Sequence, residues 1–502
     1  MTILAHRTDT VTRDALAVLQ PGFLGTTAPD WLLRQVGEGL TAVGLFGRNI
    51  ASPEQLSALT AQLRAEREDV LVAIDEEGGD VTRLEVRGGS SFPGNLALGA
   101  VDDTDLTRDV ARELGRRLAE CGVNLNWAPS ADVNSNPDNP VIGVRSFGAD
   151  TELAARHTAA YVEGLQAAGV AACTKHFPGH GDTNVDSHHA LPRIDAPLET
   201  LYARELVPFK AAMAADTKAI MSAHILLPSL DPTRPATLSP RILTGLLREE
   251  LGYQGLIVTD GMEMHAIAGT YGIERGSVLA IAAGADAICV GGGLADEETV
   301  LRLRDALVNA VREGSLPEER LADAAARVRS LADWTRRARS AAPGASDEEG
   351  NAPGTADSPV GLVAARRAVR ATGALTAPVK SAYVATLTPE PNIAVGDETP
   401  WGPAAELTAL LPDTESGSFG EDLRAEEVLA AAGERTLVAV VRDAHRHPWM
   451  TAAVDALVAA RPDTVVIEMG LPRAEPRGAL HIATHGASRV CGRAAAELIA
   501  GL

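Results

Sequence analysis

The chain has 502 residues, too many for one ordinary hydrophobic core, so we expect a large barrel followed by a second, smaller domain. Its 45 basic and 67 acidic residues give a formal net charge of -22, and such an acidic surface repels nucleic-acid phosphates and anionic lipid headgroups. We therefore expect neither nucleic acid nor a membrane as a partner.

The four cysteines are far apart in the sequence and lie mostly in apolar segments, which favours buried free thiols over a disulfide framework. The first residues contain no basic stretch followed by an apolar run, so we expect no secretory signal. No stretch of about 18 residues is apolar throughout, which argues against a transmembrane helix. We therefore expect a cytoplasmic protein.

Short apolar runs alternate with longer helical patterns over the first two thirds of the chain, as in proteins built from βα units around a parallel sheet. Helical patterns such as residues 53–64 and 296–311 fill the gaps between these runs. The number of units fits a (β/α)8 TIM-type barrel in which one strand is irregular or missed. The predicted strands are residues 41–47, 70–75, 123–129, 170–176, 219–224, 255–260 and 285–291.

Polar residues of catalytic type stand at the ends of most of these runs. In a parallel barrel the carboxyl ends of all strands open on one face, so we expect these side chains to converge on one pocket. The alternative is that polar residues only mark where strands stop, but their repetition at the same end of several units favours a site. The residues are Asp75, Asn126, the pair Lys175 and His176, His224 and Asp260.

The composition changes after the barrel. Residues 339–359 are rich in Ala, Pro, Gly, Ser and acidic residues, which is typical of a flexible linker. Further apolar runs follow it, and they predict a smaller layered α/β domain, an αβα sandwich. We therefore expect a barrel over residues 1–338, a linker over 339–359 and a C-terminal domain over 360–502.

The stretch from Lys175 to Pro192 reads K-H-F-P-G-H-G-D-T-N-V-D-S-H-H-A-L-P and holds four of the twelve histidines. It admits three explanations: a metal site, a polar loop or an acid/base device. His176 and His180 have the four-residue spacing of a helical zinc pair, but Pro178 and Gly179 between them would break that helix. No C-x-x-C or H-E-x-x-H motif accompanies them, so we expect no metal.

Acid/base chemistry needs a proton donor that can later accept a proton. Asp186 precedes His188 by two residues, and a carboxylate hydrogen-bonded to an imidazole moves the pKa of that imidazole toward or above neutrality. The common alternative for a D-x-H sequence is a loop histidine capped by its neighbour. Asp260 closes an apolar strand and suits a carboxylate nucleophile, although aspartate at a strand end is often only a helix cap.

Taken together, these motifs resemble the family 3 glycoside hydrolases from about Pro21 to Leu331, specifically their β-N-acetylglucosaminidase branch. The stretch beginning at Lys175 matches the K-H-F-P-G-H-G-x-x-x-x-D-S-H signature of that branch at every fixed position. Supporting matches are A-I-D-E-E-G-G (73–79), N-P-V-I-G-V-R-S-F-G (139–148), M-S-A-H (221–224) and T-D-G-M-E-M (259–264).

The resemblance implies a role for each matching residue, and it implies no cofactor. Asp260 corresponds to the nucleophile that forms a glycosyl-enzyme, and His188 to the general acid/base, held and polarised by Asp186. Family 3 β-glucosidases instead take this group from a glutamate in the second domain, so the D-S-H loop carries information on the substrate class. The positions that correspond to sugar-binding residues are Asp75, Arg83, Arg145, Lys175 and His176.

Three positions depart from the family pattern. Asp80 stands where an arginine is frequent, Thr259 where a serine is usual, and His265 where lysine or arginine is common. These departures concern the preference for the leaving group rather than the reaction.

The resemblance predicts a retaining exo-β-N-acetylglucosaminidase that releases terminal GlcNAc from cell-wall or chitin-type oligosaccharides through two inversions. A neutral imidazole base does not repel an anionic acceptor, so phosphate stays open as an alternative to water. A silent sugar-binding protein on the same barrel is a further alternative, against which the intact trio Asp260, Asp186 and His188 argues. The sequence leaves the oligomeric state and the role of the C-terminal domain open.

Overall fold

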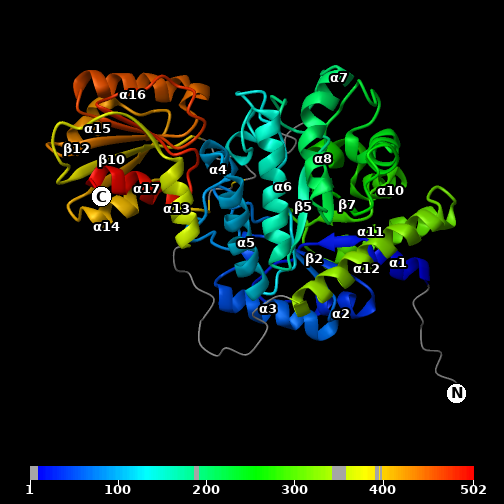
Figure 1. The fold of residues 1–502 in the computed structure, drawn as a ribbon. Coiled ribbons are helices and arrows are strands. Elements are labelled where there is room, and N and C mark those ends of the chain that lie inside the picture. The colour runs from blue at the N-terminus through cyan, green and yellow to red at the C-terminus, as the bar shows by residue number, and fades with distance from the viewer. Residues whose placement is uncertain (1–9, 186–190, 342–357, 390–394, 396–397) are drawn as a thin grey trace.

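The computed structural model of the chain describes residues 10–185, 191–341, 358–389, 395 and 398–502. Figure 1 shows two bodies side by side, each built on its own β-sheet. The first runs from blue to green, and the second, which we call the C-terminal region (residues 358–502), carries the orange and red elements. The predicted acid/base residues Asp186 and His188 lie outside the described residues.

Eight short parallel strands form the first body. Strands β2 to β7 pair in chain order, β8 pairs with β1, and a bridge between Val258 and Ala287 connects β7 to the chain entering β8. Because β1 also packs against β2, the strands form a TIM-like α/β fold, as predicted. The strands are β1 (Leu19–Pro21), β2 (Ala42–Leu45), β3 (Leu71–Ile74), β4 (Leu125–Asn126), β5 (Ala171–Phe177), β6 (Ala219–Ser222), β7 (Leu256–Thr259) and β8 (Ile288–Val290).

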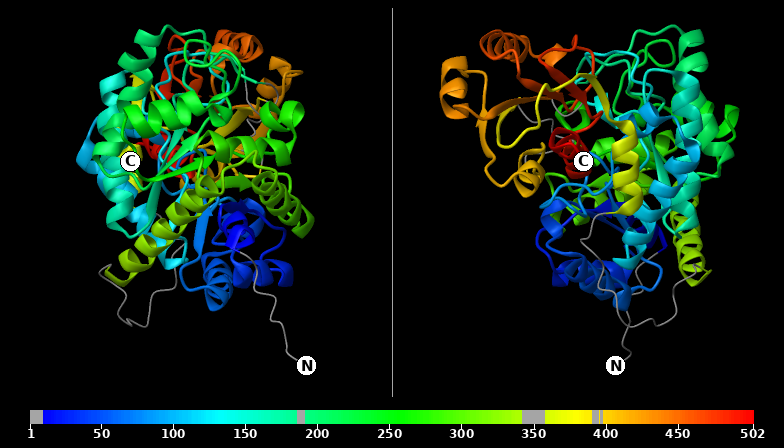
Figure 2. Two further views of the ribbon diagram at one scale, coloured as in Figure 1. Left: turned by 90° about the vertical axis from the view of Figure 1, so that its right-hand side faces the viewer. Right: turned by 60° about the vertical axis from the view of Figure 1, so that its left-hand side comes forward.

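Helices surround these strands, as the left view of Figure 2 shows. Several begin at a side-chain cap: Ser52, Asp103, Asp150 and Asp296 each accept a hydrogen bond from the backbone N–H three residues on. The helices are α1 (Thr10–Ala17), α2 (Asp30–Glu38), α3 (Pro53–Glu66), α4 (Asn95–Val101), α5 (Thr104–Glu120), α6 (Thr151–Ala167), α7 (Leu198–Thr200), η3 (Leu201–Glu205), α8 (Leu206–Ala214), η5 (Arg241–Glu250), α9 (His265–Tyr271), α10 (Ile273–Ala283), α11 (Glu297–Arg312) and α12 (Glu318–Ala341), with short turns η1 (Gly47–Asn49), η2 (Gly143–Arg145) and η4 (Ala236–Leu238).

Helix α12 closes the amino-terminal end of the strands. Its Val328, Leu331 and Ala332 belong to the same apolar cluster as the inward-facing side chains of the barrel strands. Nearby, Asn124, which precedes β4, donates a hydrogen bond to Thr335 at 3.3 Å. With this end covered, the carboxyl ends of the strands are left to form a site. The helix runs to Ala341, slightly past the expected start of the linker.

The C-terminal region contains a six-stranded sheet in the order β11-β10-β12-β13-β14-β9, parallel except for β9. Its two faces carry separate apolar clusters, one shared with α13, α14 and α17, the other with α15 and α16. The strands are β9 (Arg370–Gly373), β10 (Ala382–Leu387), β11 (Glu415–Phe419), β12 (Thr436–Val441), β13 (Val465–Glu468) and β14 (Leu480–Ala483). The helices are α13 (Pro359–Ala368), α14 (Ala404–Leu410), α15 (Ala425–Ala432), η6 (Ala444–Arg446), α16 (Pro448–Ala460) and α17 (Arg489–Ala500).

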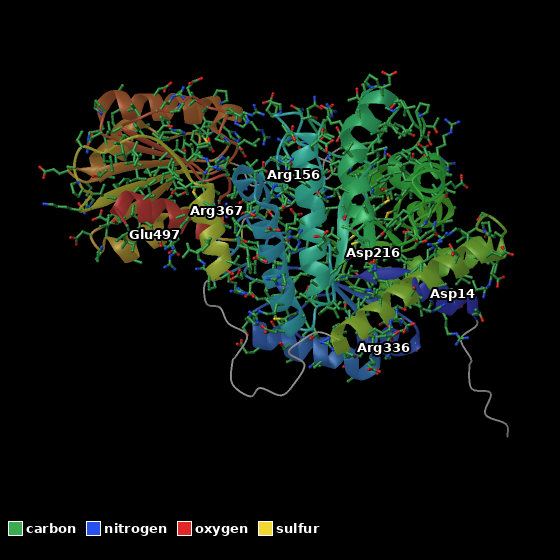
Figure 3. All side chains as sticks on the ribbon, viewed as in Figure 1. Asp14, Arg156, Asp216, Arg336, Arg367 and Glu497 are labelled. Carbon is green, nitrogen blue, oxygen red and sulfur yellow. The ribbon has the colours of Figure 1, made fainter. Side chains whose placement is uncertain are left out.

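The two bodies meet along α13, which packs against α4 and α5 and appears in yellow between them in Figure 1 and in the right view of Figure 2. Arg367 of α13, labelled in Figure 3, forms an ion pair of 2.7 Å with Asp103. Leu96, Val144 and Leu471 form a small apolar cluster across the same boundary. Among the helices that the structure describes, none is both long and apolar enough to cross a membrane.

Candidate active site

A cavity of about 680 Å³ lies at the carboxyl ends of the barrel strands. This size falls in the usual range for pockets that hold small organic ligands. All six of the predicted site residues that the structure describes line it: Asp75, Arg83, Arg145, Lys175, His176 and Asp260. They come from β5 and from the segments that follow β3, β4 and β7, so the expected convergence is found for these side chains.

Two strand-end residues that we expected in the pocket do not belong to its described lining. Asn126 donates a hydrogen bond from Nδ2 to the Glu76 carbonyl at 2.7 Å and accepts one from the Glu76 N–H at 3.0 Å. His224 donates from Nε2 to the Gly261 carbonyl at 2.9 Å. That expectation was wrong for both residues, because their side chains bond to the backbone of neighbouring segments.

Five charged side chains form the centre of the site. Arg145 holds Glu77 through hydrogen bonds from Nη2 to Oε1 at 2.7 Å and from Nε to both carboxylate oxygens, at 3.0 Å to Oε2 and 3.2 Å to Oε1. Lys175 Nζ lies 2.6 Å from Glu77 Oε1 and also contacts Asp75. Arg83 Nη2 is 3.6 Å from the other oxygen of Asp75. The carboxylates and cations therefore fix one another in the cavity wall.

Charge pairing overcomes burial in this cluster. Burial raises the pKa of Glu77, but the charges of Arg145 and Lys175 outweigh it and bring the pKa well below its usual value. Burial lowers the pKa of Lys175, while Asp75 and Glu77 raise it by more, so the net shift is upward. Both groups therefore stay ionised at neutral pH, and Lys175, which lines the cavity, presents a fixed charge to a ligand.

Glu77 was missed by the sequence analysis although a signal was present. It follows Asp75 by two residues in the D-E-E-G-G segment, and in extended backbone residues two apart point to the same side. That spacing places a second carboxylate beside Asp75.

A second buried network surrounds His176. Asp132 accepts a hydrogen bond from His176 Nδ1 at 2.7 Å and another from the His180 backbone N–H at 2.7 Å. Burial raises the pKa of Asp132, but the two histidines outweigh it and lower the pKa below its usual range. The ionised Asp132 keeps a proton on Nδ1 of His176, so Nε2 is an acceptor and takes a hydrogen bond of 3.4 Å from Arg145 Nη2.

His180 also lines the cavity, and it was not among the predicted site residues. Its Nδ1 lies 3.2 Å from Thr183 Oγ1, while its buried Nε2 has no hydrogen-bond partner within the described part of the chain. Burial lowers the pKa of His180 to about 4, so the ring is neutral at physiological pH. A neutral imidazole with a spare nitrogen can bond a hydroxyl group.

Asp260 follows β7 and is partly buried at the cavity floor. Its Oδ1 accepts a hydrogen bond of 2.8 Å from the Gly261 N–H, and its backbone N–H donates to the Ser222 carbonyl at 3.2 Å. A hydrogen bond to the ionised form favours a carboxylate that can act as a nucleophile. The bond from His224 to Gly261 braces the same turn.

A glycine loop after β8 forms the wall next to Asp260. Glu263 accepts hydrogen bonds from the Gly291 and Gly293 N–H groups at 2.9 and 3.3 Å. Arg48 donates to the Gly292 carbonyl at 2.9 Å and lies over the Phe46 ring, 4.5 Å from its centroid. The loop is thus held from both sides by residues that also line the cavity.

Apolar side chains complete the wall. Trp127, Phe46 and Met221 line the cavity, and the Phe46 and Trp127 ring centroids are 6.3 Å apart. Gly44 lies directly behind Trp127, since a Cβ at this position would come within 2.9 Å of the indole ring. From the C-terminal region, Val395 and the exposed Glu398 also reach the cavity.

The loop that carries the predicted acid/base residues is anchored at residues 180–182, just before the segment that contains them. Asn139 donates hydrogen bonds to the carbonyls of His180 and Gly181 at 2.9 and 3.0 Å, and Arg204 pairs with Asp182 at 2.6 Å. Asp186 and His188 themselves stay predictions. Across the described ranges, no three side chains of His, Cys, Asp or Glu gather closely enough to hold a metal ion.

Curated proteins with one kind of name are similar to this chain. A curated beta-hexosaminidase A from Pseudoalteromonas piscicida is 36% identical over 312 residues, which are 57% of this chain and 52% of that protein, so the chain spans about half of its length. A beta-hexosaminidase from Neisseria meningitidis serogroup C is 35% identical over 265 residues, covering 51% of this chain and 73% of that protein.

Solved structures extend the likeness to the C-terminal region. A glycoside hydrolase family 3 beta-N-acetylglucosaminidase from Paenibacillus sp. str. FPU-7 superposes with a TM-score of 0.88 at 35% identity, covering 98% of this chain and 97% of that one. A beta-glucoside phosphorylase shares the fold at 17% identity with a TM-score of 0.75, covering 98% of this chain and 92% of its own. The model of the glycosyl hydrolase family 3 N-terminal domain matches residues 30–331, more than half of the chain, and the chain therefore belongs to glycosyl hydrolase family 3.

Proposed function

We propose that the protein is a retaining exo-β-N-acetylglucosaminidase that releases terminal non-reducing GlcNAc from cell-wall or chitin-type oligosaccharides. The observation that carries the proposal is the position of Asp260, which lines the same cavity as the charged cluster around Lys175. The names of the relatives, beta-hexosaminidases and a beta-N-acetylglucosaminidase, support the same substrate class. Residues 1–338 would form the catalytic domain, 339–359 the linker and 360–502 the second domain.

In the proposed reaction, Asp260 attacks the anomeric carbon and forms a covalent glycosyl-enzyme, while the bond to the leaving group breaks. Water then attacks the same carbon and frees Asp260, so two inversions restore the original configuration. The oxocarbenium-like transition states carry positive charge, which the adjacent carboxylate of Asp260 stabilises.

The sugar would be held by the charged cluster. Carboxylate oxygens of Asp75 accept hydrogen bonds from ring hydroxyls, and Lys175 and the Arg83 guanidinium donate to hydroxyl or acetamido oxygens. His176 offers its Nε2 as an acceptor, because Asp132 fixes the proton on Nδ1. Fixed charges in a partly buried wall need little rearrangement on binding, which supports rapid turnover.

His188 would act as the general acid/base with Asp186 behind it. In the first step the imidazolium gives its proton to the oxygen of the departing group, and in the second the neutral imidazole takes a proton from water. Both residues lie outside the described part of the chain, so this assignment rests on the D-S-H motif.

Product analysis tests the proposal. The protein is incubated with 4-nitrophenyl β-N-acetylglucosaminide and with a GlcNAc-MurNAc disaccharide, each with and without phosphate, and Asp260→Ala serves as the inactive control. We expect free β-GlcNAc as the first product and loss of activity in the variant. A sugar 1-phosphate would instead identify a phosphorylase, and a wild-type protein without turnover would identify a silent sugar-binding protein.

A further inference from the structure

Asp80 lies at the tip of a hairpin formed by residues 75–84, which we call the substrate hairpin. Gly78 and Val81 pair as antiparallel neighbours, and the Glu77 N–H donates to the Val81 carbonyl at 3.1 Å. Gly78 and Gly79 take φ values of 74° and 63°, which only glycine adopts readily and which turn the chain sharply. The two legs of the hairpin carry Asp75 and Glu77 on one side and Arg83 on the other.

The base of the substrate hairpin is held from within the barrel. The buried Glu76 carboxylate accepts hydrogen bonds from the backbone N–H groups of Arg83 and Leu84, both at 2.7 Å, and from Thr82 Oγ1 at 3.1 Å. Glu76 itself is fixed by Asn126 through its backbone. These bonds join the two legs near their ends, and at the tip the Gly79 N–H donates to the Phe92 carbonyl at 3.0 Å, which leaves the Asp80 carboxylate to be paired from outside the first body.

The C-terminal region holds the tip. Asp80 Oδ2 lies 2.5 Å from Arg442 Nη2, and Asp80 Oδ1 accepts a hydrogen bond of 2.7 Å from the Ala487 N–H. Arg442 follows β12 and Ala487 lies between β14 and α17, so two separate segments converge on one carboxylate. The Arg442 guanidinium also lies over the Trp401 ring, 5.9 Å from its centroid, which restricts its orientation.

Burial makes this contact hard to replace. Only 2% of the Asp80 side chain is exposed, and 15% of the Arg442 side chain. A buried carboxylate without a cationic partner is strongly unfavourable, so loss of Arg442 should destabilise the tip of the hairpin in this position. An arginine at position 80 would here face Arg442 and be repelled.

We propose that Asp80 is a positioning residue, through which the C-terminal region holds the substrate hairpin and keeps Asp75 and Arg83 in the cavity wall. The C-terminal region is then part of the substrate-binding device without supplying the reacting groups. In its effect on sugar affinity, this inference rests on the proposed function.

Four variants test the proposal: Arg442→Gln, Arg442→Lys, the neutral pair Asp80→Asn with Arg442→Gln, and the control Arg367→Gln. The control removes another ion pair between the two bodies, Arg367 with Asp103, which does not touch the hairpin. Arg442→Gln should raise KM for 4-nitrophenyl β-N-acetylglucosaminide about tenfold, because the misplaced groups bind the ground state. Arg442→Lys keeps the charge but loses the planar guanidinium over Trp401, so its KM should lie between those of the wild type and Arg442→Gln.

The neutral pair separates positioning from stability. It contains no unpaired buried charge, so its thermal midpoint should return close to that of the wild type, while its KM should stay raised. The Arg367→Gln control should leave KM unchanged. If KM in Arg442→Gln and in the neutral pair equals that of the control, the contact between Asp80 and Arg442 does not affect the site, and the proposal is overturned.

Amide hydrogen exchange gives a readout that does not depend on activity. Residues 77–82 should exchange faster in Arg442→Gln and in the neutral pair than in the wild type or in Arg367→Gln. Equal exchange in all four proteins would overturn the proposal. A wild type that releases no GlcNAc would overturn the proposed function instead, while the exchange comparison would still decide whether Asp80 holds the hairpin.

Discussion

Asp132 bonds to His176 through the imidazole Nδ1 at 2.7 Å, and the same carboxylate accepts the backbone N–H of His180 at 2.7 Å. One buried acidic group thus fixes both the tautomer of His176 and the path of the chain that leads to the predicted acid/base loop. A change in the orientation of His176 would therefore affect the backbone at His180, and the reverse, because both bond to Asp132.

Replacing Asp132 should therefore impair catalysis, although we assign Asp132 no direct contact with the substrate. In Asp132→Asn the amide can present its NH2 group to His176, which permits the other tautomer and removes the acceptor at Nε2. We expect kcat/KM for 4-nitrophenyl β-N-acetylglucosaminide to fall about 10- to 100-fold, as when an aspartate that orients a histidine is lost. Steady-state kinetics at several pH values would measure it.

Asp182→Asn is the matched control, because Asp182 belongs to the same loop but pairs outward with Arg204. It should change kcat/KM by less than about threefold, as expected for a partly exposed ion pair. Equal losses in the two variants would mean that Asp132 only stabilises the loop.

Glu77→Gln should cost more stability than any exposed ion pair. Glu77 is the buried anion between Arg145 and Lys175, and its loss leaves two cations with Asp75 as their nearest counter-charge. Removing one partner of a buried ion pair lowers the free energy of unfolding by about 3–5 kcal/mol. Urea unfolding followed by circular dichroism would measure this loss.

The control for Glu77 is Glu163→Gln, which removes an exposed partner of Arg108 on the outer surface. Such pairs contribute about 0–1 kcal/mol. A loss below 1 kcal/mol in Glu77→Gln would show that the two cations find other partners, and that the cluster does not depend on Glu77.

Glu205 should make stability depend on pH in the neutral range. Its side chain is 1% exposed; Oε1 accepts a hydrogen bond from Arg204 at 2.6 Å, and Oε2 lies against Gly179. Burial raises the pKa of Glu205 from 4.5 to about 7, against the opposing effect of Arg204. The folded protein therefore keeps a proton that the unfolded chain releases between these pH values.

Because the pKa of Glu205 is higher in the folded protein than in the unfolded chain, raising the pH destabilises the fold. The contribution of Glu205 to stability is complete below pH 4.5 and is lost as the pH rises to about 7. Between pH 4.5 and about 7, the free energy of unfolding should decrease less in Glu205→Gln than in the wild type, and the difference should be at most about 3 kcal/mol. The exposed Glu199 on the neighbouring α7 provides the control, since Glu199→Gln should leave the slope unchanged. Burial also raises the pKa of Glu76 and of Glu468 to about 7, so part of the slope remains in Glu205→Gln, and only an undiminished slope would contradict the prediction.

Local sequence predicted the parts of the site that depend on strand ends. Asp75, Lys175, His176 and Asp260 stand at the carboxyl ends of apolar runs, and parallel strands bring such ends together. The same rule failed for His224, because the rule predicts where a strand ends but not which hydrogen bond its last side chain makes. Strand β1 was missed because its three residues are too few for a periodic pattern.

The partners of these residues could not be predicted in the same way. Glu77 and Arg145 are 68 positions apart, and Asp132 and His176 are 44 apart, so no local pattern joins them. The residue at position 80 is understood only with Arg442, which follows β12 in the C-terminal region. In each case the side chain is buried, and the identity of its partner depends on tertiary packing rather than on spacing.

His188→Ala tests the acid/base assignment directly. A leaving group with a high pKa needs a proton as the bond breaks, whereas 2,4-dinitrophenolate does not, so the variant should slow a GlcNAc disaccharide about 100- to 10,000-fold and the activated aryl glycoside far less. The adjacent histidine offers a matched control, because His189→Ala should leave both rates near those of the wild type. Initial rates on both substrates would measure the contrast. Equal slowing on the two substrates would assign His188 to binding, and the proton donor would then have to be sought elsewhere in the cavity, with Glu398 as the carboxylate contributed by the C-terminal region.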